Sequence, residues 1–173
     1  MALIVEDGSI VENANSYFAR ADLIAYAMLR GVVIADADAS DVFAIKAMDY
    51  LETFRGQFSG QEVEPGVQPL AWPREGVCVG FVAYPSNAIP SNIVKAQLAL
   101  ALLSSQGIDF MPTSGAGASS EGFITREKIG PMETEYSEAI ELAKGITPVM
   151  PQISALLAPF LTGGAGPTRS YRV

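Results

Sequence analysis

Residues 90–105, PSNIVKAQLALALLSS, contain one charged side chain, Lys95, and are apolar on more than one side. The apolar residues recur three and four positions apart, which places side chains on one face of an α-helix. One seam comprises Ile89, Ile93, Ala96, Leu100 and Leu103, and a second comprises Val94, Leu98 and Ala101. We therefore expect a helix from Pro90 to about Ser105, packed within the domain core or between subunits.

Three further helices are expected around this one. A helix over about Arg20–Leu29 is closed by Gly31. A second ends near Arg55 and carries Asp38 and Ser40 as candidate N-caps. Its apolar face comprises Phe43, Ala47, Tyr50, Leu51 and Phe54. A short helix from Pro151 to about Leu161 is expected to weaken at Pro159. The pattern predicts a mainly α fold, a small bundle of about four helices.

The connection over residues 56–88 contains four prolines and is expected to be long and irregular. Within it, Trp72 is expected to cover one side of the helix core, and a ligand-stacking role is the alternative. Cys78 lies in the apolar run Val77-Cys78-Val79, which favours a small buried side chain.

A short β-ribbon is expected at about residues 123–136, because two strand-like segments flank Gly130-Pro131. One segment carries Arg126 and Lys128, and the other carries Glu133 and Glu135. Opposite charges that face each other across a ribbon favour pairing.

The domain organisation expected is a helical domain over residues 1–162, with the ribbon as an insertion, followed by an extended C-terminal arm over residues 163–173. The arm begins Gly-rich and ends without an acidic side chain. Arginine and tyrosine are enriched at protein interfaces. We therefore expect the arm to dock onto a partner through Pro167, Thr168, Arg169, Ser170, Tyr171, Arg172 and Val173.

The composition favours contact with other subunits. Only 17% of residues are charged and 49% are apolar, so part of the surface is expected to be buried in an assembly. A well-packed monomer rich in alanine and glycine is the alternative. The net charge is −8 and no basic stripe is present, which disfavours tight DNA wrapping. No segment is long and apolar enough to span a membrane, and a membrane partner is not expected.

The residue content disfavours catalysis. The sequence has no histidine and one cysteine, which removes the commonest general base and a thiolate zinc site. The glycine-rich stretch at residues 113–120 lacks the lysine and helix of a phosphate-binding loop. Glu133 and Glu135 lie two positions apart on a predicted strand and are the candidate carboxylate pair of a hydrolase. We expect no enzymatic activity, no cofactor and no metal.

Short motifs in order along the chain resemble conserved segments of tailed-phage neck proteins, the head–tail connector adaptors, and of the DnaT-like single-stranded-DNA-binding protein family. The motifs are Ala2–Gly8 with Asn13–Tyr17, Asp49–Leu51 with Arg55-Gly56, Leu70–Arg74, Ile89-Pro90 with Ala96 and Leu98-Ala99, Arg126–Pro131 with Glu135-Tyr136, and Leu156–Pro159.

The resemblance to adaptors implies a virion structural protein made in the host cytoplasm. It implies a ring, with twelve subunits as in those adaptors, that lies beneath the portal in the phage neck. The C-terminal arm would dock onto the portal protein, and a tail-side neck or tail terminator protein would bind the opposite side. DNA would pass through the channel without specific binding. The alternative from a different class is a single-stranded DNA-binding accessory protein.

Overall fold

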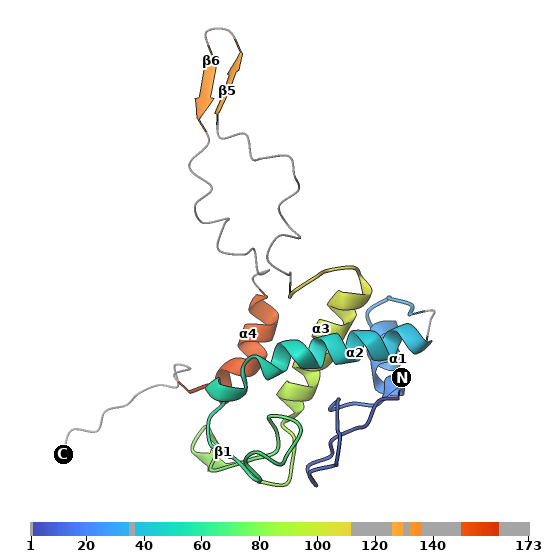
Figure 1. Ribbon diagram of the computed structural model, residues 1–173, viewed down its shortest axis with the longest axis vertical. Helices are drawn as coiled ribbons and strands as arrows, with labels where there is room; N and C mark the ends of the chain where they lie inside the picture. The colour runs from blue at the N-terminus through green and yellow to red at the C-terminus, as the bar shows by residue number, and fades with distance from the viewer. Residues whose placement is uncertain (1, 35–36, 112–125, 130–131, 136–149, 163–173) are drawn as a thin grey trace, which may run out of the picture. The chain divides into compact units, whose positions relative to one another are not determined.

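The computed structural model describes residues 2–34, 37–111, 126–129, 132–135 and 150–162 (Figure 1). In these residues the fold is mainly α, with four α-helices and three two-stranded antiparallel ribbons. Contacts divide the chain into one unit of residues 1–108 and 150–173, and a second of residues 109–149. The second unit is longer than the insertion expected at 123–136, and the arm at 163–173 lies outside the described residues.

The helix α3 (Ser91–Ser105) is central to the first unit. It contacts α1 (Arg20–Met28), α2 (Ala37–Glu52) and α4 (Pro151–Leu157). Nine of its fifteen residues are buried, because neighbouring helices cover most of both apolar seams. The start differs by one residue from the prediction, since Pro90 occupies the N-cap and Ser91 begins the helix.

The helix α2 begins earlier than predicted and buries a different face. Asp38 and Ser40 lie inside the helix and do not precede it as caps. The buried residues are Ser40, Asp41, Ala44, Ala47, Met48 and Leu51, whereas Phe43, Tyr50 and Phe54 are half-buried. The predicted face was therefore right for Ala47 and Leu51 and wrong for the three aromatic residues. Small side chains at the centre of the seam let α2 approach α3, and the large rings flank it.

The connection over residues 56–88 is more regular than expected. Two short ribbons form within it, β1 (Gln61–Glu62) with β2 (Arg74–Glu75), and β3 (Cys78–Val79) with β4 (Val82–Ala83). Gly60 has φ +72°, and a Cβ there would collide with the carbonyl oxygen of Glu75. Only glycine therefore fits the close approach of β1 to β2.

The end of α4 agrees with the predicted effect of Pro159. The α-helix stops at Leu157 and continues as a 3₁₀ turn, η2 (Ala158–Phe160). Leu161 then bridges to Phe58, and both the backbone N–H and the hydroxyl of Thr162 donate to the carbonyl oxygen of Gln57, at 2.7 and 2.8 Å. These bonds fix where the last described residue lies, beside the 3₁₀ turn η1 (Arg55–Gln57).

A buried glutamine ties three parts of the first unit together. The Gln97 side chain accepts a hydrogen bond from the backbone N–H of Tyr17 at 2.9 Å. Its amide nitrogen donates to the hydroxyl of Ser16 and to the carbonyl of Ala44, at 3.2 and 3.1 Å. Because buried polar groups must be paired, this residue joins α3 to α2 and to the segment before α1.

The second unit contains the β-ribbon that the sequence predicted. Its strands are β5 (Arg126–Ile129) and β6 (Met132–Glu135). Arg126 lies opposite Glu135 and Lys128 lies opposite Glu133 in the register. The predicted charge pairing across the ribbon is therefore confirmed at the level of register.

Candidate functional site

A buried arginine organises the loop that joins η1 to β3. Arg74 is 6% exposed. Its guanidinium donates to the carbonyl oxygens of Ser59 at 2.9 Å, Gly60 at 3.1 Å, Ala71 at 3.2 Å and Phe58 at 3.4 Å. Burial lowers the pKa of Arg74 from its usual value. The guanidinium is therefore engaged in internal hydrogen bonds.

Carboxylates flank this arginine within the same loop and at the end of α2. Glu62 lies 3.9 Å from Arg74 and 3.5 Å from Arg55, and Glu52 lies 2.9 Å from Arg55. Burial raises the pKa of Glu52, and the hydrogen bond from the Ala71 N–H and the charge of Arg55 oppose that rise. These ion pairs and hydrogen bonds hold the loop against α2.

Trp72 lies at the centre of an aromatic cluster, as a core residue. It is 0% exposed, and its ring makes edge-to-face contacts with Phe160 at 5.6 Å, Phe58 at 5.8 Å and Tyr84 at 6.3 Å between centroids. No open ring face is left for a ligand, so the core alternative is the one observed. Burial also raises the pKa of Tyr84.

The other residues expected at packing positions divide into two groups. Ile93 and Leu100 are fully buried within this chain, whereas Ile89 and Leu103 are half-buried. Trp72, Ile93 and Leu100 thus form the core of one chain. Ile89 and Leu103 retain surface with which a neighbour can be contacted.

Two sets of sequence-predicted residues remain outside the described side chains. The arm residues from Pro167 to Val173 lie outside the described residues, and the side chains of Glu133 and Glu135 are not described. In the described residues no group of histidine, cysteine, aspartate or glutamate is arranged to hold a metal ion. Across the same residues, no helix is long and apolar enough to cross a membrane.

Cations are scarce on the surface of the first unit. Residues 2–34, 37–108 and 150–162 contain eleven acidic and six basic side chains, a net charge of −5. Arg20 pairs with the buried carboxylate of Asp41 at 2.9 Å, and Arg55 and Arg74 are occupied as described above. The basic residues exposed in these ranges are Arg30, Lys46 and Lys95.

Two groups of strongly exposed apolar side chains lie close together in sequence within the described residues. At the end of α1, Met28, Leu29 and Val33 are 66%, 85% and 82% exposed. In the β3–β4 hairpin, Phe81 and Val82 are 93% and 70% exposed. Large exposed apolar side chains that cluster mark contact surfaces. Sequence reasoning missed both places, because the residues carry no signal that separates them from core residues.

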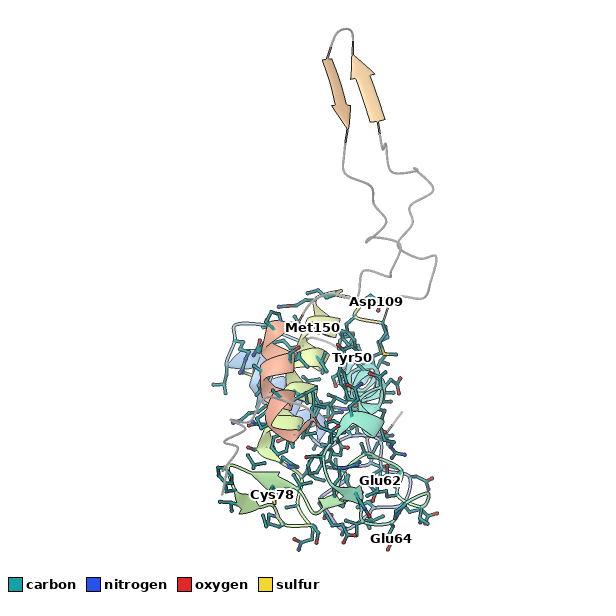
Figure 2. The ribbon with its side chains drawn as sticks, turned by 90° about the vertical axis from the view of Figure 1, so that its left-hand side faces the viewer. Tyr50, Glu62, Glu64, Cys78, Asp109 and Met150 are labelled. Atoms are coloured by element: carbon teal, nitrogen blue, oxygen red, sulfur yellow. The ribbon has the colours of Figure 1, made fainter. Side chains whose placement is uncertain are left out.

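Cys78 also lies in this hairpin and is exposed, so the expectation of a buried cysteine was wrong. Alternation of side chains in the extended chain is the reason. Val77, which precedes β3, is fully buried, and the next side chain, Cys78, points outward. Figure 2 shows Cys78, Glu62 and Glu64 at the end of this unit opposite Met150, where α4 begins.

Comparison with known proteins gives one family. The family model described as "Putative DnaT-like ssDNA binding protein" matches residues 1–173. No curated protein and no solved structure gives a significant match. Because the family model covers the whole chain, the protein belongs to this DnaT-like single-stranded-DNA-binding protein family.

Proposed function

We propose that this protein binds single-stranded DNA as a non-catalytic accessory protein. The observation that carries the proposal is the family match over residues 1–173. The described surface restricts where the DNA can bind. Residues 2–34, 37–108 and 150–162 contain six arginines and lysines, and four of them, Arg20, Arg30, Arg55 and Arg74, are held in internal contacts. We expect weak, salt-dependent binding, since the first unit is acidic overall.

We assign the contact between basic side chains and the DNA phosphates to residues 163–173. This segment carries Arg169, Tyr171 and Arg172 and no acidic residue. Arginine contacts phosphates and a tyrosine ring stacks on bases, the combination that sequence-independent binding of single strands uses. The segment follows Thr162, which is hydrogen-bonded to Gln57 of the folded unit.

Removing the two arginines of this segment is expected to weaken DNA binding. The test compares the intact chain with R169Q/R172Q by fluorescence anisotropy, using a labelled oligothymidylate at several salt concentrations. Loss of two phosphate contacts should reduce the slope of log K against log salt by about 1.4. The matched control is K46Q/K95Q, which removes the same charge from two exposed lysines of the folded unit and should leave the slope nearly unchanged.

Two results would count against this assignment. If the intact chain does not bind the oligonucleotide at low ionic strength and micromolar concentration, the proposed function is wrong. If the two double variants lose affinity equally, only the net charge matters and the contact is not in the segment 163–173.

A second candidate function is the head–tail adaptor ring of a tailed phage, located in the virion neck between the portal and a tail-side protein. The exposed apolar side chains of Met28, Leu29 and Val33 favour it, because a surface of that kind suits contact between subunits. The acidic first unit suits a channel that DNA passes without adhering. In this function the arm, Pro167–Val173, docks onto the portal.

Assembly distinguishes the second candidate from the first. The intact chain should sediment as a ring, and L29E/V33E should remain monomeric while keeping its helical circular dichroism spectrum. A chain ending at Thr162 should lose co-sedimentation with portal rings. An intact chain that stays monomeric at high concentration and does not co-sediment with portal would exclude the adaptor.

A further inference from the structure

The tip of the β3–β4 hairpin presents an aromatic ring in an unfavourable backbone conformation. Val79 pairs with Val82, so Gly80 and Phe81 form a two-residue turn. Both have positive φ, +57° and +69°. Glycine and asparagine are the usual residues for this turn, and a bulky side chain in the left-handed region is strained. Strain of this kind in a native protein points to a function for the side chain that causes it.

The Phe81 ring has no intramolecular cover. It is 93% exposed, and it is the one aromatic residue classed as exposed in the part of the chain that the structure describes. Residues 76–86 contain no charged side chain. The ring is therefore open to solvent at the turn, and residues 76–86 contain no acidic side chain that would repel a phosphate backbone.

We propose that Phe81 is a base-stacking residue, which receives a nucleobase of single-stranded DNA on its ring face. This inference rests on the proposed DNA-binding function and deepens it. An exposed aromatic ring can stack on any base without sequence preference, because every base has a π-face.

Substitutions at Phe81 test the inference in the full-length protein. In the anisotropy assay, F81L should weaken binding to oligothymidylate about 5- to 100-fold, because one stacking contact is lost. F81W should bind at least as tightly as the intact chain. F81N should bind as weakly as F81L but unfold at a higher temperature, since asparagine tolerates the left-handed turn. F54L, which changes a half-buried aromatic residue of the folded unit, is the matched control and should bind normally.

An oligonucleotide of abasic sites with the same length completes the experiment. The intact chain and F81L should bind it equally, since no base is present to stack. If the intact chain binds no oligonucleotide, the proposed function fails. If it binds oligothymidylate and F81L binds as well, the function stands and Phe81 is not the stacking residue. If F81L changes self-association and leaves DNA binding unchanged, the hairpin contacts a protein and the inference is overturned.

Discussion

The W72A variant is expected to unfold with a free energy about 3–5 kcal/mol below that of the intact protein. Trp72 is 0% exposed, and its ring contacts Phe58, Tyr84 and Phe160. Alanine leaves a cavity between the connection and η2 that these rings cannot fill without leaving their own contacts. Denaturant unfolding followed by far-ultraviolet circular dichroism measures the effect.

The W72F variant separates the loss of ring volume from the loss of the indole N–H. Within the described part of the chain the Trp72 Nε1 is buried without a hydrogen-bond partner. Removing an unsatisfied donor offsets part of the cost of a smaller ring, so W72F should lose less than about 2 kcal/mol. A loss below about 1 kcal/mol for W72A would contradict the packing described here.

The helices could be predicted from the sequence because local patterns determine them. The apolar seams at residues 89–103 predicted α3 to within one residue, and Gly31 and Pro159 marked where neighbouring helices end. The ribbon register followed from the opposite charges on β5 and β6. These features depend on residues close together in sequence, where side-chain spacing decides the conformation.

The features that could not be predicted depend on contacts far apart in sequence. Gln97 is buried because Tyr17, eighty positions away, supplies a backbone N–H to pair with its side chain. The burial of Arg74 depends on the carbonyls of Phe58, Ser59 and Gly60, which the turn after η1 directs toward it, fourteen to sixteen positions away in sequence. The exposure of Phe81 could not be predicted, because the sequence does not show which side of the β3–β4 hairpin faces the core. The amino-acid composition does not predict these contacts. A polar residue is buried only where hydrogen-bond partners from other parts of the chain meet it.

The R74M variant is expected to lose about 3–5 kcal/mol of the free energy of unfolding. Methionine keeps the length and removes the charge, so the carbonyls of Ser59, Gly60 and Ala71 lose their donor in a buried position. Glu62 also loses one of its two cationic neighbours. Leaving such groups unpaired costs more than the hydrogen bonds themselves contribute. Chemical denaturation of R74M and the intact chain measures the difference.

A double-variant cycle assigns that loss to its cause. If the unpaired Glu62 carboxylate dominates, R74M/E62Q should recover most of the stability. If the carbonyls dominate, as their number and short distances imply, the double variant should remain as unstable as R74M. R30M removes an exposed arginine that lies over the Tyr26 ring at 3.3 Å and should cost less than about 1 kcal/mol. Equal losses for R74M and R30M would mean that the buried guanidinium does not hold the loop.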